Sequence, residues 1–515
     1  MTEPTTLPIS RRRKMTIYVA ALVGMFMATL DMQIVATALP TIAADLGNLE
    51  LFGWVGASYL LATAAVTPFY GKLSDLFGRK RVFMVAIALF VAGSLACGIA
   101  WSMEALIAAR VLQGLGGGGL MTLAFGVMAD LFEPRERAKY QGFSSAVFTL
   151  SGLIGPVAGG LISQAFGWEY IFLVNLPIGV AVIAVLAFAM PNFATGRQPK
   201  IDFPGGLLLA GAVTALVFWA EEALGGGYGG VMVYVLPVVI VVALIAFVLV
   251  ERRASEPMVP LHLLGNSTIA LALLISVIAG VASLGMLNYF ALFLQTVTGL
   301  PPALAGLLFL PSSVGSLVAS VGTGYLVAQT GRYKPYPIAA MALGIVVLLF
   351  FTTVTAATPV WVIGVGMFFF SASMGLQMQT LMVAVQAAAP RKDVGAATGT
   401  LTLARMIGAS LGLAANGGIL TAGLVRGQEG ISPETLAVMP GPMKEMTPSV
   451  IATLPAAAAH EVVTVFTSAF SMVYYTGAGL FALGLVFALA MKNVKLEGHG
   501  AAAGNPGPGQ PVLAE

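Results

Sequence analysis

Charged residues are scarce in this chain of 515 residues, because Asp, Glu, Lys and Arg together make up only 9% of it. A water-soluble domain carries roughly 25% charged residues. The sequence therefore excludes a soluble globular protein, a disordered chain and a coiled coil. The net charge of +3 and the scattered basic residues give no indication of a nucleic-acid partner.

Cysteine and histidine are also nearly absent. The single cysteine, Cys97, cannot form an internal disulfide bond, which excludes a secreted disulfide scaffold. The three histidines fall in predicted loops or in the tail, without metal-binding spacing. Two patterns typical of enzymes, at 114–119 and 408–412, lie within apolar runs and follow no strand. We therefore expect no enzyme, no metal ion and no cofactor.

Apolar residues, in contrast, make up 58% of the chain. A helix needs about 20 mostly apolar residues to cross the hydrocarbon core of a membrane. The first such run is too long for a signal peptide and lacks a small-residue cleavage site, so we expect it to stay as a span. Fourteen runs qualify, at 16–38, 54–72, 82–100, 105–128, 139–163, 168–190, 204–220, 231–250, 267–294, 302–328, 337–356, 359–386, 394–424 and 468–491.

Basic residues predict the orientation of these spans. All but four of the 25 lysines and arginines lie at the two termini or in the even-numbered gaps between spans. Loops rich in Lys and Arg stay in the cytoplasm, so both termini are predicted to be cytoplasmic, in the plasma or inner membrane. All five tryptophans fall at the opposite ends of spans, where the indole ring prefers the membrane interface.

An internal repeat divides the chain. The segment GKLSDLFGRKR at 71–81 follows span two, and a similar segment, GYLVAQTGRYK at 324–334, follows span ten. Repeats of this kind place substrate sites at their interface, near the membrane midplane. We predict an all-α polytopic membrane protein with six-helix bundles at 1–200 and 266–515 and two inserted helices at 201–265. The second bundle includes a long outer loop at 425–467 and a disordered cytoplasmic tail.

Three charged residues, Asp31, Arg110 and Arg405, lie within predicted spans. Each costs roughly 2.5–3.5 kcal/mol at mid-bilayer, so such groups face a bundle interior or a wet cavity. One interpretation is a buried ion pair that only fixes helix packing. The other is that Asp31, on an apolar helix face, binds and releases a proton during transport. The acidic pair Glu221 and Glu222 is predicted to be solvated at the membrane edge.

The loop at 71–81 combines glycines, which permit a tight turn, with acidic and basic side chains that can form and break ion pairs. This combination suits a gate on the cytoplasmic face, whereas simple anchoring of the topology would explain only the bases. The expected gating residues are Gly71, Asp75, Gly78, Arg79, Lys80 and, as the opposing carboxylate, Asp130.

The fifth span is rich in small residues. Glycines at helical spacing let helices approach closely, and a proline removes a backbone hydrogen bond and bends its helix. We therefore expect a helix that slides and flexes. The residues concerned are Gly152, Gly155, Pro156, Gly159 and Gly160.

Polar and adaptable side chains are candidates for lining a substrate cavity. A stripe of methionine and aromatic residues is more often packing than ligand contact, although methionine surfaces tolerate varied ligands. Both interpretations stay open at this point. The candidates are Asp31 and Gln33 in the first span, Asn288, Tyr289, Phe290 and Phe293 in the ninth, and Met374, Gln377, Met378 and Gln379 in the twelfth.

Four motifs together resemble those of the fourteen-helix drug:proton antiporter branch of the major facilitator superfamily, and the likeness covers nearly the whole chain. Gln33 and Ala36 depart from the usual first-helix motif, and Glu169 stands where an arginine is expected. The four motifs are 30-LDMQIVATALP-40, 71-GKLSDLFGRKR-81, 106-LIAARVLQGLGGG-118 and 155-GPVAGG-160.

The resemblance implies a role for four of the charged residues. Arg110 would take part in proton coupling, and Asp31 would contribute to coupling or to substrate capture. Asp75 and Arg79 would gate the inner face. Gly155 and its neighbours would form the antiporter motif, which accompanies export rather than uptake in the family.

The expected function is proton-coupled multidrug efflux, by alternating access, of lipophilic and often cationic compounds, with consequences for antibiotic resistance. The expected partners are a small-molecule substrate, protons as the coupling ion and the lipid bilayer, without nucleic acid, and the expected state is a monomer. An exporter dedicated to one endogenous metabolite, antibiotic or lipid is the alternative among transporters. A membrane sensor or scaffold is the alternative outside transport.

Overall fold

The computed structural model describes residues 10–132, 134–191, 202–224, 230–254, 259, 261–390 and 393–492. Within these ranges every regular element is a helix. Up to residue 251 the elements are α1 (Arg11–Leu46), η1 (Leu49–Leu51), α2 (Phe52–Phe77), α3 (Arg79–Gly98), α4 (Met103–Leu131), α5 (Pro134–Ala165), α6 (Tyr170–Leu173), α7 (Asn175–Ala189), α8 (Phe203–Leu224) and α9 (Met232–Glu251).

The second part of the chain is equally helical. We refer to α1–α7 as the first half and to η2–α19 as the second half. The elements after residue 260 are η2 (Leu261–Gly265), α10 (Ser267–Ala279), the π-helix η3 (Gly280–Leu284), α11 (Gly285–Val297), α12 (Pro302–Leu307), α13 (Phe309–Thr330), α14 (Pro335–Phe351), α15 (Val360–Ala388), α16 (Val394–Gln428), α17 (Pro433–Val438), η4 (Met443–Glu445), α18 (Pro448–Ile451) and α19 (Ala456–Ala490).

Membrane-length apolar helices confirm the predicted all-α polytopic fold. Each of the fourteen predicted runs overlaps a helix or a broken helix. Twelve segments of the described chain are long and apolar enough to cross a membrane. Two shorter apolar helices, Leu150–Ala165 and Pro335–Phe351, coincide with the predicted fifth and eleventh spans. The count of fourteen crossings therefore stays a prediction, while the fold class does not depend on it.

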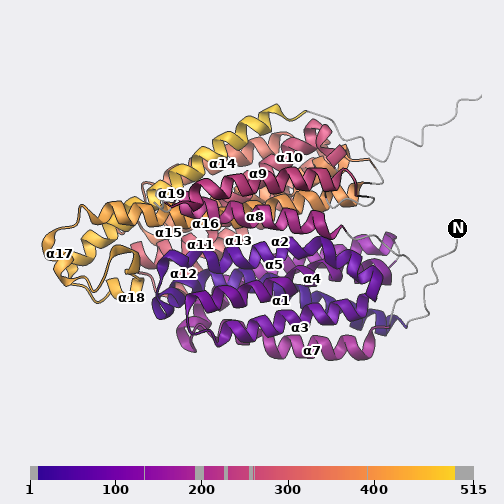
Figure 1. Ribbon diagram of the computed structural model, residues 1–515, viewed down its shortest axis with the longest axis horizontal. Helices are drawn as coiled ribbons and strands as arrows, with labels where there is room; N and C mark the ends of the chain where they lie inside the picture. Colours follow the sequence, from indigo (N-terminus) through magenta and orange to yellow (C-terminus); the bar gives the residue numbers. More distant parts are fainter. Residues whose placement is uncertain are drawn as a thin grey trace, which may run out of the picture.

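The helices run roughly along the longest axis of the molecule, and the two ends of the bundle differ (Figure 1). α1 begins and α19 ends at one end, which we call the terminal end. The opposite end carries α17, η4 and α18, which project beyond the helix bundle (Figure 1); we call it the loop end. The predicted cytoplasmic side corresponds to the terminal end.

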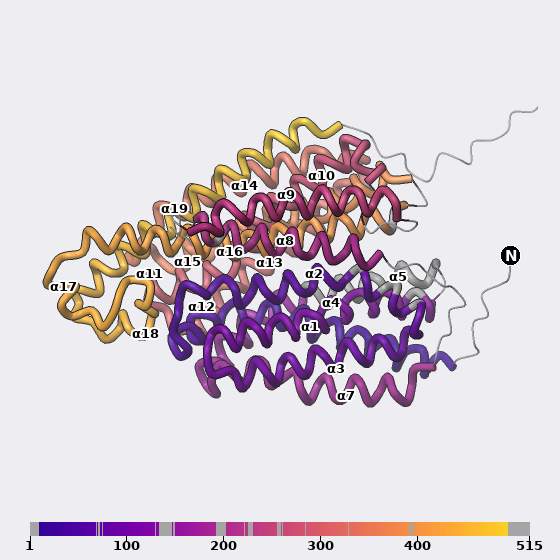
Figure 2. The backbone as a smooth tube through the Cα atoms, viewed as in Figure 1, coloured from indigo at the N-terminus to yellow at the C-terminus, as the bar shows by residue number. Residues whose placement is uncertain are grey.

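Each half is held by its own helix pairs. α1 packs on α5, and α4 packs on both α2 and α3, whereas α13 packs on α15 and α14 on α19. The inserted helices α8 and α9 pack on each other, and α8 also contacts α2 and α16. Figure 2 shows them side by side, with α8 between α2 and the helices of the second half. The domain boundaries near 200 and 265 stay predictions.

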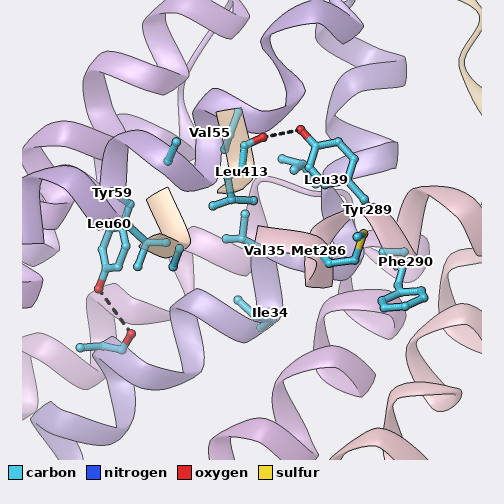
Figure 3. Packing of buried hydrophobic residues seen from close by; sticks show 14 of the residues in the cluster. Ile34, Val35, Leu39, Val55, Tyr59, Leu60, Met286, Tyr289, Phe290 and Leu413 are labelled. Carbon is cyan, nitrogen blue, oxygen red and sulfur yellow. Dashed lines mark hydrogen bonds between the residues drawn. The ribbon is translucent and has the colours of Figure 1, made fainter. Parts of the chain in front are cut away.

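The two halves meet along a seam, formed where α2 contacts α16, α5 contacts α12 and α1 contacts α11. On the second-half side of this seam, Tyr289 of α11 donates a hydrogen bond of 2.8 Å to the carbonyl oxygen of Leu413 in α16 (Figure 3), and both groups face Gly53 of α2. Gly53 makes the approach possible, because a Cβ atom there would lie 2.5 Å from the Leu413 oxygen. These contacts lie toward the loop end of the helices, so the halves are closed there.

The loop end carries a further link between the halves. Lys444 of η4 forms an ion pair of 2.9 Å with Glu50 of η1, and both side chains are about two-fifths exposed. The hydrogen bond and charge of Glu50 raise the pKa of Lys444 above its usual value. The contact is therefore fully present below the usual lysine pKa and is lost as the pH rises through the raised one. Exposed pairs of this kind contribute little stability.

Close helix contacts in the second half depend on glycine, which a matched pair of substitutions tests. A Cβ atom at Gly285 of α11 would lie 2.6 Å from the backbone of Gly412 in α16, whereas nothing lies within 4 Å of one at Gly479 in α19. We expect Gly285→Ala to destabilise the protein by about 1–3 kcal/mol. Gly479→Ala should be neutral or slightly stabilising. Thermal unfolding in detergent measures both, and equal melting temperatures would contradict the packing.

Candidate functional site

A buried ion pair occupies the interior of the first half. Asp31 lies near the middle of α1 and Arg110 near the start of α4, and each side chain is only about 1% exposed. The guanidinium of Arg110 donates to the Asp31 carboxylate through Nη1. The structure thus joins two of the three charges that the sequence places within spans.

Two amide side chains complete the hydrogen bonding of the Asp31 carboxylate. Gln113 donates from Nε2 to Oδ1 over 2.8 Å, and Asn175 donates from Nδ2 to the same oxygen over 2.9 Å. Ser94 accepts from both amides, over 2.7 and 3.3 Å. All three residues are buried. The carboxylate therefore receives donors from α4 and α7, and its solvation shell consists of protein groups.

The guanidinium of Arg110 is equally well satisfied. Its Nε donates to the carbonyl oxygen of Val55 over 3.1 Å, and Nη1 donates to Oε1 of Gln113 over 2.6 Å. The ring of Tyr59 lies 4.2 Å from its central carbon, in a cation–π arrangement. Arg110 therefore has protein partners besides Asp31.

Residue-by-residue inspection of the sequence missed several members of this network. Asn175 and Ser94 are polar residues within apolar runs, and Tyr59 lies in a span whose one charged residue, Lys72, is at its far end. Asn175 had a usable signal, because an amide inside an apolar span needs a hydrogen-bond partner. Ser94 and Tyr59 had none, since serine and tyrosine are common in spans and their partners come from other helices.

Arg405, the third charge within a span, is not part of this network. It lies in α16 of the second half, and its side chain is half-buried. Among the residues that the structure describes, no hydrogen-bond or ion-pair partner of its guanidinium is found.

The predicted gating residues are partly brought together at the terminal end. Arg79 forms an ion pair of 2.9 Å with Asp130. Lys80 instead donates to the carbonyl oxygen of Ala187, over 2.6 Å, at the end of α7. Gly78 has φ +85°, a conformation that side chains rarely adopt, and it separates α2 from α3.

The gating prediction at the two remaining positions is not resolved by the described side chains. The side chain of Asp75 and the surroundings of Gly71 lie outside the part that the structure describes.

The contact of Lys80 with the end of α7 has a counterpart in the second copy of the repeat. There, Lys334 donates to the carbonyl oxygen of Leu489 at the end of α19. A lysine near the end of a helix complements the negative end of its dipole.

The glycines and proline of α5 lie against both halves. A Cβ atom at Gly155 would lie 2.5 Å from Cβ of Gln33 in α1, and one at Gly160 would lie 3.1 Å from Cα of Ala303 in the second half. Gly159 is packed against α1 in the same way as Gly155. The motif therefore brings α5 close to α1 on one side and to α12 on the other.

Pro156 has a specific consequence for this contact. Proline has no backbone N–H, so the carbonyl oxygen of Gly152, one helical turn earlier, has no helical donor. Ser313 of α13 supplies a donor instead, over 2.5 Å, from the other half. Thr37 of α1 donates to the carbonyl oxygen of Pro156 itself, over 2.9 Å. The proline thus creates a hydrogen bond across the seam.

Apart from Asp31, the substrate-contact candidates fall into four environments. Gln33 is half-buried beside α5, while Asn288 and Tyr289 lie at the seam against α2. Phe290 and Phe293 are buried in an aromatic cluster of the second half that includes Phe351, Phe370, Phe470 and Tyr474. In α15, Met374 is half-buried, Gln377 is buried, and Met378 and Gln379 are exposed. For the two phenylalanines, this geometry supports the packing interpretation.

A bundle of membrane-length helices in two halves, with a seam between them and a buried charge network, defines a polytopic membrane transporter. The sequence profile described as Major Facilitator Superfamily matches residues 21–413. The chain belongs to this family, and it is a multi-pass membrane protein.

Relatives within the family carry efflux names. Multidrug resistance protein 3 of Bacillus subtilis is 34% identical over 403 residues, with 78% of each chain covered. Multidrug transporter protein MdtP of the same organism is 30% identical over 521 residues, with 94% of each chain covered. An uncharacterized MFS-type transporter of Mycobacterium tuberculosis is 34% identical over 507 residues, covering 96% of this chain and 73% of the relative.

Solved structures agree in fold. A bacterial homologue of the human lysosomal transporter Spinster, in an inward-facing and occupied conformation, has a TM-score of 0.65 at 13% identity, with 94% of this chain and 97% of that one covered. A D-xylose-proton symporter has a TM-score of 0.61 at 14% identity, with coverage of 92% and 97%. At these identities the likeness concerns the fold alone.

The Asp31–Arg110 pair is predicted to be strongly coupled. Removing one partner leaves a buried charge unpaired, so we expect Asp31→Asn and Arg110→Gln each to cost about 3–5 kcal/mol of unfolding free energy. The double variant should cost clearly less than the sum, because no charge is left unpaired. Denaturant unfolding of the purified protein measures the cycle. Additive costs would contradict a direct pair.

Proposed function

We propose that the protein is a proton-coupled antiporter that exports lipophilic compounds, cations among them, by alternating access. The observation that carries this proposal is the buried network around Asp31, the single carboxylate that the described spans bury beside a guanidinium. The names of its relatives, multidrug resistance protein 3 and multidrug transporter MdtP, support the direction and the breadth of transport.

Protonation of Asp31 is the chemical step that would drive the cycle. A protonated carboxyl group no longer carries the charge that holds Arg110, so the attraction between α1 and α4 weakens. α1 also packs on α5 and α11, which border the seam between the halves. A change in α1 is thereby transmitted directly to that seam. The membrane potential supplies about 2.3 kcal/mol per elementary charge per 100 mV.

Opening at the loop end requires the seam to separate. The contacts there consist largely of glycine positions and of hydroxyl or amide groups on carbonyl oxygens, such as Gln295 on Thr37 over 3.1 Å. Water can replace such hydrogen bonds at modest cost. The Lys444–Glu50 pair is also easily broken, because ion pairs between exposed side chains are weak. The seam therefore suits a contact that forms and breaks in each cycle.

Transport in proteoliposomes tests the role of Asp31. Asp31→Asn should reduce the transport of a fluorescent lipophilic cation, driven by a pH gradient, to background, because an amide carries no titrating proton. Glu104→Gln, the same chemical change at an exposed position of α4, should leave transport unchanged. Full pH-gradient-driven transport by Asp31→Asn would refute the assignment.

A cross-link tests alternating access at the loop end. Glu50→Cys and Lys444→Cys, joined by a short reducible bifunctional thiol reagent, should arrest transport, because the pair links the two halves. Reduction should restore it, and the buried Cys97 should not react. The control pair is Ser432→Cys with Glu461→Cys, whose side chains are in contact within the second half. Arrest by the control link as well, or continued transport in the first, would contradict the movement.

A further inference from the structure

Arg405 is an intramembrane charge to which the proton-coupling network gives no role. Arg110 holds a carboxylate, two protein oxygens and an aromatic ring. Arg405, by contrast, has no hydrogen-bond or ion-pair partner among the residues that the structure describes. A charge within a membrane span is costly, and more so without a protein partner. A partner from outside the chain would remove this penalty.

The internal repeat gives Arg405 of α16 a corresponding position in α5 of the first half. Gly408 and Gly412 pack against Val277 and Val281, as Gly155 and Gly159 pack against α1 in the first half. Arg405 precedes Gly408 by three residues, as Gly152 precedes Gly155.

Gly152, the counterpart of Arg405, lies on the seam, where its carbonyl oxygen accepts from Ser313 of the other half. A Cβ atom at Gly152 would lie 3.5 Å from Nε2 of Gln33, a substrate-contact candidate. By this correspondence, α16 has an arginine at the position where α5 has a glycine without a side chain.

The neighbours of α16 show where the side chain points. Leu403 and Ile407 line an apolar pocket together with residues of α2 and α8. Positions two residues away on either side lie on the opposite face of a helix. Arg405 therefore lies on the face of α16 opposite to this pocket, next to Gly408, which packs against Val277 of α10.

The π-helix beside Arg405 adds a second polar feature. π-Helices occur mostly as single turns and are frequent at functional sites. Gly280 begins η3, and a Cβ atom there would lie 2.7 Å from the backbone nitrogen of Ala409. The hydroxyl of Ser283, in the same turn, is buried, and no hydrogen-bond partner for it is found among the described residues. The guanidinium of Arg405 and the hydroxyl of Ser283 thus belong to two elements in contact, α16 and η3.

We propose that Arg405 binds the acidic group of a transported compound, a carboxylate or a phosphate. The guanidinium is planar and always charged, and it donates two parallel hydrogen bonds to such groups. The inference rests on the proposed transport function and extends its substrate class to amphiphilic acids and zwitterions. Arg110 does not serve this purpose, since its guanidinium is occupied by the carboxylate of Asp31.

A matched pair of dyes tests the acid site by direct binding. Rhodamine 110 carries a free carboxylate, and rhodamine 123 is the methyl ester of the same dye. We expect Arg405→Gln to weaken binding of the acid about tenfold or more, the size of a charge-assisted hydrogen bond, and binding of the ester less than twofold. Arg405→Lys should lie between. Arg426→Gln, an exposed arginine of the same helix, is the control. Fluorescence anisotropy with purified protein in detergent measures all affinities.

Three outcomes would overturn the acid site: equal loss for both dyes, no loss for the acid, or no binding of either dye. A lipid headgroup is the other source of the same chemistry. Nanodiscs of phosphatidylcholine with and without phosphatidylglycerol distinguish it, because a lipid-bound Arg405 would make the effect depend on the anionic lipid and not on the dye. Failure of the transport proposal is separate: it would appear as absent pH-gradient-driven movement of the ester by the unmodified protein.

Discussion

The first half of the molecule is organised around one constraint, the pairing of Asp31 with Arg110 in an interior that water does not reach. Two opposite charges in a medium of low dielectric constant attract strongly, but each must also recover the hydrogen bonds lost on leaving water. The protein meets this requirement with Gln113, Asn175 and the carbonyl oxygen of Val55. Because the pair and these groups together come from four helices, the pair determines how α1, α2, α4 and α7 are positioned.

Backbone contacts determine how the halves meet. Glycine positions on α2 and α5 let helices of the two halves approach so closely that a single methyl group would collide with the backbone of the neighbouring helix. Pro156 then leaves one carbonyl oxygen without its helical donor, and Ser313 satisfies it from the other half. A seam built in this way is closely packed and carries few strong bonds. It stabilises one arrangement of the halves without preventing another, which alternating access requires.

Most of the fold follows from composition, whereas only part of the site does. Apolar runs and their basic flanks predict the helices, because crossing a bilayer imposes a length and a composition on each span. The intramembrane charges also stand out, since each is costly. Which charges pair does not follow: Asp31, Arg110 and Arg405 are equally conspicuous in the sequence, and helix packing alone decides that the third stays apart.

The same limit applies to residues whose meaning depends on their neighbours. Ser94 and Tyr59 become parts of the charge network only through helix packing. Phe290 and Phe293 could have lined a cavity, and instead stack within the second half. Aromatic and hydroxyl side chains serve packing and binding equally well, so their sequence pattern does not distinguish the two. Single-residue patterns predict where charge is costly, and three-dimensional contacts show what compensates it.

The two halves share a repeat but differ in how they hold the arginine within their spans. The first half compensates its intramembrane arginine, Arg110, with Asp31, which takes up the proton in the proposed cycle. In the described part of the second half Arg405 has no ion-pair partner, so an acid that bound there would offset part of the cost of keeping that charge in the membrane. Such a division would separate the coupling ion from the cargo. A proton and an acidic substrate would then act on different helices, α1 and α16, and both of these helices border the seam that must open.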